Sequence, residues 1–330
     1  MSDIFADLLM EATLSAPAMH PDMTILTDAR DAAGPKGETA AEQRAFWTAY
    51  TGALNEPAPA DMTVWDETVP TADHKVPVRI YRPSGLDGPA PAVMYMHGGG
   101  FMLGDLDSSD AVAWGFAEQA RALVVSVDYR LTPDHPYPAA FNDCWGTLLW
   151  MVEHAARLGL DPARIAVAGD SAGGNLGAAM ALKARDTGAL ELAAAAIIYP
   201  GTGLDQDQPS YSQFADGPGL TRAGTIKYRD LYLPHDRDTD DPYARPVMAA
   251  DLTGLPPFWV HSAEIDPIRD DGRVFSAKLA QAGCHVTYRE ARGMIHGFMR
   301  ARFKGQAARH EYDLICRFLC DHLHGDDDHS

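Results

Sequence analysis

The sequence predicts an α/β protein with a mostly parallel central sheet covered by helices on both faces. From residue 91 onward, short apolar segments rich in β-branched residues alternate with longer helix-forming segments. Strands that are apolar throughout are buried on both faces, as parallel strands joined by helical crossovers are. The chain has 330 residues, of which 46% are hydrophobic. That is enough for one large core, with or without an appended segment.

The strand segments are apolar runs that are bounded by turn-forming or charged residues. Val76–Tyr81 is the first such segment, and Pro83 ends it. Ala92–Met96 and Leu123–Val127 follow, and neither contains a charged residue. The expected strands, in order, are 76–81, 92–96, 123–127, 165–168, 194–199, 258–261 and 285–288.

Helix-forming segments lie between these strands. The expected helices are 111–121, 139–156, the stretch after residue 171, 272–282 and 307–322. The first 60 residues look helical at intervals, with interruptions at Pro21, at Gly34 and around Pro57. Trp47 and Tyr50 are spaced to share one face of a helix in this region.

The alternation of strands and helices breaks between residues 201 and 251. This stretch is rich in Pro, Asp and aromatic residues and has one helical piece near 221–231. It follows a predicted strand, at the edge of the sheet where ligand-binding loops gather. A plain surface loop is the alternative, but loops of this length without a function are uncommon in compact domains. We therefore predict a lid.

Ser171 is the first candidate for chemistry. It lies at the centre of Gly169-Asp170-Ser171-Ala172-Gly173, between a β-branched apolar run and a stretch rich in Ala, Leu and Met. This order predicts a strand, a sharp turn and a helix, which together hold a nucleophilic serine in a strained conformation at the top of a sheet. The flanking glycines keep side chains away from the crowded turn.

A nucleophilic serine needs a base, and the base needs a carboxylate. His296 follows the last predicted strand, so it reaches the same sheet edge as Ser171. Asp266 follows the strand before it and is the preferred acid. The competing acids are Glu264, nearer to the strand, and Asp270 and Asp271, which fall where a helix is expected to begin.

Backbone N–H groups for a developing oxyanion are expected in His97-Gly98-Gly99-Gly100-Phe101, directly after a buried strand. Gly99, Gly100 and the residue after the serine, Ala172, are the expected donors. A phosphate-binding loop is the rival interpretation, but no Gly-Lys-Ser/Thr follows. We expect His97 to orient the loop rather than to act as a base.

Composition excludes several classes of partner. The net charge of −19 disfavours nucleic acid and anionic membrane surfaces, and no apolar run is long enough to span a membrane.

The N-terminus has early acids and no basic segment before an apolar block, so we expect no secretory signal. The four cysteines form no disulfide pattern, and we interpret Cys316 and Cys320 as reduced thiols on a helix rather than as metal ligands with His324. These features predict a cytoplasmic protein.

Five sequence blocks together resemble the hormone-sensitive-lipase-like esterases, bacterial family IV, in the GDSAG subgroup of the α/β-hydrolase superfamily. They are His97–Gly100, Asp128–Leu131, Gly169–Asn175, Asp266–Asp270 and His296–Phe298. The resemblance implies an α/β-hydrolase fold with a helical cap. The implied parts are an N-terminal cap segment at 1–60, a catalytic core at 61–200 and 251–324, and a cap insertion at 201–250; a disordered tail is expected at 325–330.

The resemblance further implies hydrolysis of small carboxylic esters with short or medium acyl chains. Ser171 matches the nucleophile, Asp266 the acid and His296 the base, while Gly99, Gly100 and Ala172 match the oxyanion donors and Gly98 completes their loop. It implies no cofactor and no metal, and a homodimer through the edge of the last strand. Two alternatives remain open: an amidase or arylformamidase with the same triad, and a non-catalytic binding module, which would be expected to lack the histidine.

Substrate-contacting residues are expected beside the catalytic loops and in the insertion. Phe101, Tyr199, Phe214 and Ile295 are the principal candidates. The wider set adds Met102, Leu103, Tyr211, Leu220 and Met294, and ordinary core packing is the alternative for each.

Overall fold

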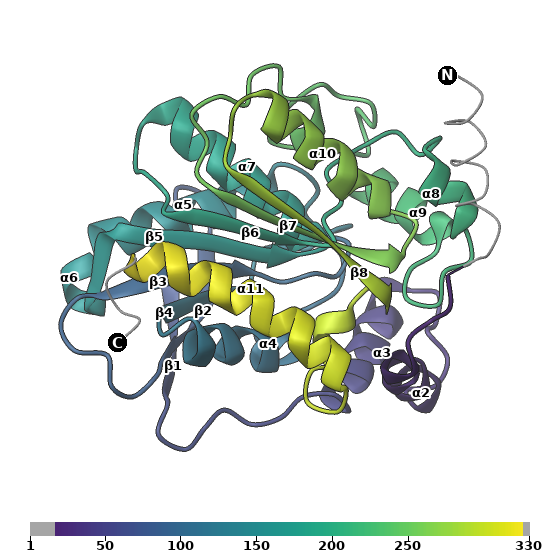
Figure 1. Ribbon diagram of the computed structural model, residues 1–330, viewed down its shortest axis with the longest axis horizontal. Helices are drawn as coiled ribbons and strands as arrows, with labels where there is room; N and C mark the ends of the chain where they lie inside the picture. The colour runs from purple at the N-terminus through teal and green to yellow at the C-terminus, as the bar shows by residue number, and fades with distance from the viewer. Residues whose placement is uncertain (1–16, 326–330) are drawn as a thin grey trace, which may run out of the picture.

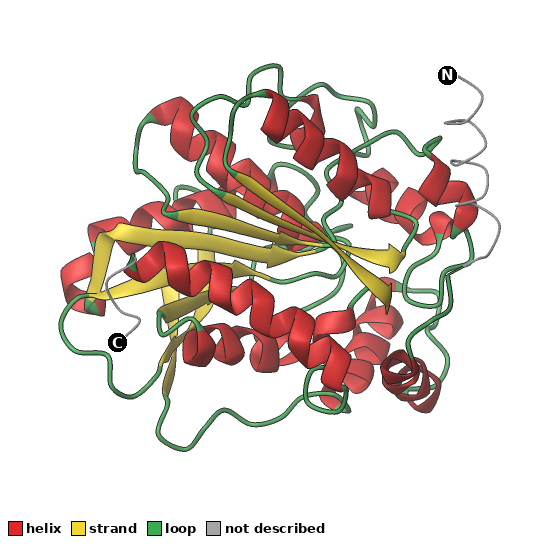
Figure 2. Ribbon diagram, viewed as in Figure 1, coloured by secondary structure: helices red, strands yellow, loops and turns green. Residues whose placement is uncertain are grey.

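An eight-stranded sheet forms the centre of the computed structural model, which describes residues 17–325 (Figures 1 and 2). Its strands lie in the order β1-β2-β4-β3-β5-β6-β7-β8. β1 pairs antiparallel with β2 and β2 with β4, whereas all later pairs are parallel. The strands are β1 Thr63–Pro70, β2 Lys75–Arg82, β3 Ala90–Met96, β4 Leu123–Val127, β5 Leu160–Asp170, β6 Ala194–Ile198, β7 Phe258–Ile265 and β8 Val286–Ile295. The mostly parallel sheet that the sequence predicts is confirmed.

Helices cover both faces of the sheet. One face packs on α4 and α11 and the other on α5, α7 and α10 (Figure 2). The helices of the core are α4 Leu106–Gln119, α5 Ala139–Glu153, α6 Ala155–Leu158, α7 Ala172–Thr187, α10 Arg269–Gln281 and α11 Gln306–His324, with the short 3-10 helix η3 at Phe298–Ala301. Along β3, Val93 and Tyr95 enter one core while Met94 and Met96 enter the other. This alternation is why the strand is apolar at every position.

All seven predicted strands are present, but β1 was not predicted. Its side chains are mostly exposed or half-buried, and Val69 is its one buried residue. As the edge of the sheet, β1 packs little apolar surface, so its sequence carries charged residues and a terminal Pro70. Apolar runs in the sequence therefore identify the central strands but not this edge strand.

The remaining helices lie at the carboxyl end of the parallel strands (Figure 1). From the N-terminal segment come η1 Pro21–Met23, α2 Thr24–Ala32 and α3 Ala40–Gly52; from the stretch between β6 and β7 come α8 Pro209–Gln213, α9 Arg222–Tyr232 and η2 Pro246–Met248. The two groups contact one another: Arg30 Nη2 donates to the Gly219 carbonyl oxygen at 3.0 Å, and Lys227 Nζ donates to Gln43 Oε1 at 2.9 Å. The predicted tail at 325–330 lies outside the described residues except for Gly325.

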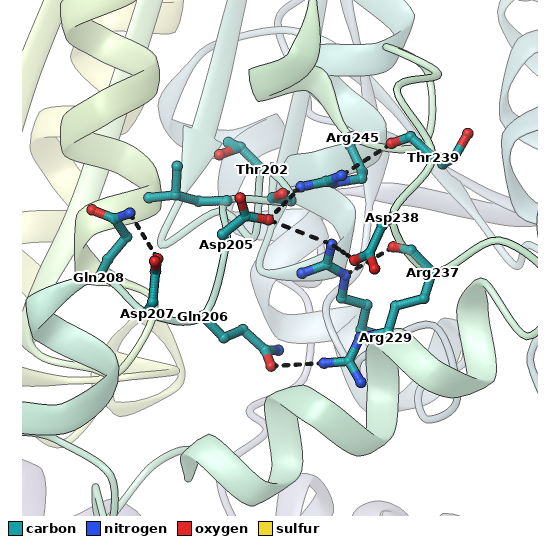
Figure 3. Close-up of polar contacts among 12 residues, drawn as sticks. Thr202, Asp205, Gln206, Asp207, Gln208, Arg229, Arg237, Asp238, Thr239 and Arg245 are labelled. Atoms are coloured by element: carbon teal, nitrogen blue, oxygen red, sulfur yellow. Dashed lines mark hydrogen bonds and ion pairs between the residues drawn. The ribbon is translucent and has the colours of Figure 1, made fainter.

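Charged side chains connect the parts of the stretch between β6 and β7 (Figure 3). Arg245 Nη2 lies 2.8 Å from Asp205 Oδ1, and Arg229 Nη2 lies 3.1 Å from Asp238 Oδ1 and 3.9 Å from Asp205. Burial and the nearby Arg245 lower the pKa of Arg229. Both aspartates are largely exposed, so these pairs contribute little stability and mainly hold α9 in register with the loop after β6.

A buried ionic cluster joins α11 to the last two strands. Glu311 on α11 accepts hydrogen bonds from Arg289 Nη2 on β8 at 2.7 Å and from His261 Nε2 on β7 at 3.0 Å. Burial lowers the pKa of His261, so its ring is neutral, and Trp259 Nε1 donates to the other ring nitrogen. Burial raises the pKa of Glu311, but the hydrogen bonds from Arg289 and His261 outweigh it and lower that pKa to about 2.

Replacing Glu311 with Gln should remove an acid-sensitive part of the stability. A carboxyl group with a lowered folded-state pKa contributes stability that is present above its ordinary value of 4.5 and is lost as the pH falls toward about 2. We expect Glu311→Gln to lower the free energy of unfolding at pH 7 by about 2–3 kcal/mol and to flatten its decline between pH 5 and pH 3. Urea denaturation of both proteins across this range measures the effect. An unchanged slope in the variant would contradict it.

Candidate active site

Ser171 lies in a strained turn between β5 and α7. Its backbone has φ 57° and ψ −116°, a conformation that L residues rarely adopt. The turn depends on its two flanking glycines, because a Cβ at Gly169 would lie 2.1 Å from the Gly173 carbonyl oxygen and one at Gly173 would lie 1.9 Å from the Met96 carbonyl oxygen. Only glycine allows strand, turn and helix to approach so closely, and the turn holds the hydroxyl at the carboxyl end of β5.

His296 and Asp266 meet Ser171 at this edge of the sheet. His296 Nε2 lies 2.9 Å from Ser171 Oγ, and His296 Nδ1 lies 2.6 Å from Asp266 Oδ2. Asp266 is fully buried after β7, and its other carboxylate oxygen accepts the backbone N–H of Ile268 at 3.1 Å. The carboxylate therefore fixes the imidazole with a proton on Nδ1, which leaves Nε2 free to accept the serine proton.

The competing acidic residues have other partners. Glu264 Oε2 accepts the backbone N–H of Gly293 at 2.7 Å. Asp270 lies in the first turn of α10 and accepts the backbone N–H of Ser210 at 2.9 Å. Asp271 accepts the hydroxyl of Tyr211 at 2.7 Å, and burial raises its pKa to about 6. None of these three contacts the imidazole, so of the four candidate acids Asp266 is the one placed to serve it.

Three backbone N–H groups are free beside Ser171. Within residues 17–325, the amides of Gly99, Gly100 and Ala172 donate no hydrogen bond. Gly99 and Gly100 have φ 141° and 63°, which turns the loop after β3 into a conformation that favours glycine. The Gly98 N–H instead donates to Asp170 Oδ1 at 2.8 Å. Gly98 therefore supports the loop and is not available as an oxyanion donor.

His97 is part of the support for this loop. It is completely buried, its ring stacks on Tyr129 with centroids 4.3 Å apart, and its Nδ1 lies 3.0 Å from the Gly98 carbonyl oxygen. The Tyr129 hydroxyl donates to the His97 carbonyl oxygen at 2.6 Å. Burial lowers the pKa of His97, and the ring does not contact Ser171. This geometry suits the orienting role that we expect from the sequence.

A cavity of about 620 Å³ opens above Ser171, within the range of small-molecule sites. Phe101, Leu103, Tyr199, Tyr211 and Leu220 line it, as we expect from the sequence. Two of the four principal candidates do not. Ile295, the last residue of β8, packs in the core and leaves the outward position to His296. Phe214 packs in the same core, with the guanidinium of Arg269 over its ring. The other two of the wider set, Met102 and Met294, are also buried outside the lining.

The stretch between β6 and β7 supplies lining residues that we did not single out from the sequence. The ring of Tyr228 on α9 packs flat against Gly100, where a Cβ would lie 2.4 Å from Tyr228 Cγ. Tyr232 stacks on Phe101 with centroids 3.6 Å apart. The backbone of Gly219 lies against His296 so closely that a Cβ there would lie 2.6 Å from the His296 carbonyl oxygen. Tyr228 is the one aromatic residue in the predicted helix at 221–231, and its sequence neighbours do not indicate which loop its ring contacts.

Comparison with known proteins finds a matching family, related sequences and similar solved structures. A family described as having the α/β hydrolase fold matches residues 93–300. Carboxylesterase NlhH of Mycobacterium tuberculosis is 46% identical over 227 residues, which cover 68% of this chain and 71% of that protein. An arylesterase of Saccharolobus solfataricus is 34% identical over 240 residues, 71% of this chain and 76% of that protein. The crystal structure of a thermostable esterase from Pseudomonas putida ECU1011 is similar with a TM-score of 0.87 and 30% identity, over 94% of this chain and 99% of that one.

Proposed function

This chain belongs to the α/β-hydrolase family, in its hormone-sensitive-lipase-like branch, and is a carboxylic ester hydrolase; we propose that Ser171, His296 and Asp266 carry out its reaction. The observation that carries this assignment is the continuous contact from Asp266 through His296 to Ser171, next to three free amides. The substrate is a small-molecule ester. Within the described residues, no helix is both long and apolar enough to cross a membrane.

The proposed reaction has two acyl-transfer steps. Ser171 Oγ attacks the ester carbonyl carbon as His296 Nε2 accepts its proton, and the oxyanion receives hydrogen bonds from Gly99, Gly100 and Ala172. The imidazolium, stabilised by Asp266, then protonates the leaving alcohol, and an acyl-enzyme remains. Water attacks the acyl-enzyme while His296 takes its proton, and collapse of the second tetrahedral intermediate releases the acid and restores Ser171.

Assays of an ester and an amide on one preparation test the proposed class of reaction. We expect turnover of p-nitrophenyl butyrate to exceed that of an aryl formamide, because two relatives from Mycobacterium tuberculosis, carboxylesterase NlhH at 46% identity and esterase LipI at 40%, are esterases. Faster hydrolysis of the formamide would favour the amidase or arylformamidase alternative. The absence of any turnover would favour a binding module, against which the close contact of His296 with Ser171 argues.

We propose a preference for short and medium acyl chains, because aromatic rings wall the cavity close to Ser171. Tyr228 covers Gly100, and Tyr232 with Phe101 forms a stacked pair beside it. On p-nitrophenyl esters from C2 to C16, we expect kcat/KM to peak near C4–C6 and then to fall. Replacing Tyr228 with Ala should raise the ratio of C10 to C4 activity by about tenfold, since several buried methylenes gain room.

Tyr288→Ala is the matched control for this variant, since Tyr288 is a half-exposed tyrosine on the edge strand β8 outside the cavity. We expect its chain-length profile to equal that of the wild type. A wild-type rate that rises steadily from C4 to C16 would contradict the chain-length proposal. An unchanged profile in Tyr228→Ala would show that this ring does not limit the acyl chain.

We also propose a cytoplasmic location and a helical cap made by the N-terminal segment and residues 201–250. Cys144, Cys284 and Cys316 form no disulfide within the described residues, which suits a reducing compartment. The contacts of Arg30 with Gly219 and of Lys227 with Gln43 support a cap in which the two segments act together. A homodimer through β8 stays a prediction, to be checked by light scattering.

A further inference from the structure

Asp170, the residue before the candidate nucleophile, has four donors around its carboxylate. Its Oδ1 accepts the Tyr95 hydroxyl at 2.7 Å and the Gly98 N–H at 2.8 Å. Its Oδ2 accepts the Tyr199 hydroxyl at 3.2 Å and lies 3.9 Å from Arg300 Nη2. Asp170 is only 3% exposed. A buried carboxylate of this kind is expensive to keep, so its partners indicate what it does for the site.

Asp170 and its three hydrogen-bond donors come from the ends of three adjacent strands. Tyr95 and Gly98 lie on and after β3, Asp170 ends β5, and Tyr199 follows β6. These are the strand ends that carry the glycine loop, Ser171 and the aromatic neighbour of His296, whose ring centroid lies 4.7 Å from that of Tyr199. One carboxylate thus connects the three parts of the site that must keep a fixed geometry.

The tyrosine and arginine side chains around Asp170 keep the protons that face its carboxylate. Burial, and then the charge of Asp170, raises the pKa of Tyr95 and of Tyr199 well above the ordinary range, so both phenols keep their protons. Arg300 is itself buried: its Nη1 donates to the Ser108 carbonyl oxygen at 2.9 Å, and its guanidinium lies 5.1 Å from the ring centroid of Trp47. No partner can move without leaving a buried polar group unpaired.

The contact of Asp170 with Gly98 lies directly before the expected oxyanion donors in the chain. A Cβ at Gly98 would lie 2.5 Å from Asp170 Oδ2 and 2.9 Å from the Asp170 carbonyl oxygen, so the glycine allows the loop to press against this residue. The next two residues in the chain, Gly99 and Gly100, have the free amides. Both have positive φ and no side chain, so the loop depends on backbone anchors on either side of them. The Gly98 N–H is the anchor on one side, and the Gly99 carbonyl oxygen, which accepts the Leu103 N–H at 2.9 Å, is the anchor on the other.

We propose that Asp170 is a positioning residue that holds the Gly98 N–H so that the amides of Gly99 and Gly100 point at the developing oxyanion. It does not touch the reacting atoms. This inference rests on the proposed function, because it assigns a role in the same reaction. It predicts that loss of the carboxylate weakens binding of the transition state more than binding of the substrate.

Asp170→Asn tests the proposal with little change in size. An amide has one acceptor oxygen and turns an NH2 group toward either Gly98 or Arg300, so it cannot satisfy all four donors. We expect kcat on p-nitrophenyl butyrate to fall about 100-fold and KM to change by less than about threefold, as for a displaced oxyanion donor. The inhibition constant for butylboronic acid, which forms a tetrahedral adduct with the serine, should rise by a similar factor.

Two further variants keep the test decisive. Gly98→Ala pushes the loop away from Asp170 and should give the same signature by a different route. Asp143→Asn is the matched control, since Asp143 is a fully buried aspartate that pairs with Arg130 at 2.8 Å outside the cavity. It should lower stability without changing kcat. All rates are divided by the folded fraction from circular dichroism, so unfolding alone does not imitate the effect.

The results separate this inference from the proposed function. An inactive wild type would overturn the proposed function itself. An active wild type whose kcat and boronate affinity survive Asp170→Asn within about threefold would overturn the positioning role. An equal loss of kcat in Asp143→Asn would also overturn it, because any buried ion pair would then have the same influence.

Discussion

Ser171→Ala should lower kcat on p-nitrophenyl butyrate by roughly 10⁴- to 10⁶-fold while the protein stays folded. The hydroxyl is the atom that His296 Nε2 contacts at 2.9 Å, so its removal takes away the nucleophile that the imidazole activates. The residual rate would reflect substrate binding and the oxyanion donors alone. Stopped assays at high enzyme concentration, with thermal melting of the same sample, measure both quantities.

Ser126→Ala is the control for this variant. Ser126 is a completely buried serine on β4, and its hydroxyl has no hydrogen-bond partner among residues 17–325. Its removal should leave turnover unchanged and alter stability little, because no hydrogen bond is lost. Near-native turnover in Ser171→Ala would refute the assignment of the nucleophile.

Asp266→Asn should lower kcat by roughly 10³- to 10⁴-fold, the second largest effect that we expect. Asp266 Oδ2 lies 2.6 Å from His296 Nδ1, and Asp266 itself is fully buried. An amide in its place can turn its NH2 toward the ring, which would favour the tautomer with its proton on Nε2. That tautomer cannot accept the serine proton, and the imidazolium would lose its neighbouring negative charge.

Asp270→Asn distinguishes a specific role of Asp266 from a general need for acids in this region. Asp270 is buried in the first turn of α10 and bonds to Ser210 and Arg269, not to His296. We expect its kcat to stay within about tenfold of the wild type. A larger loss in Asp270→Asn than in Asp266→Asn would mean that the acid has been wrongly assigned.

Sequence reasoning located the central strands and the loops that follow them because both are local features. Ser171, Asp266 and His296 each come after an apolar run, and parallel strands bring the ends of such runs to one edge. The glycines of the turn at Ser171 and of the loop after β3 could be recognised from the sequence for the same reason. At these positions the backbone segments approach so closely that only glycine fits.

Features that depend on long-range packing could not be predicted in this way. The ring of Tyr228 over Gly100 joins segments more than a hundred residues apart, and no periodicity indicates it. Ile295 looked like a pocket residue because it adjoins His296, but neighbours in a strand point to opposite sides. The partners of Asp170 lie in three separate segments, so its motif could be read but its contacts could not.

Covalent labelling tests most directly whether Ser171 is the nucleophile that His296 activates. The wild type is treated with a fluorophosphonate and digested, and the modified peptide is identified by mass spectrometry. We predict one label, on Ser171, with a rate of labelling that falls by at least about 100-fold in His296→Ala. A label on another residue, or full esterase activity in protein whose Ser171 is completely labelled, would contradict this assignment.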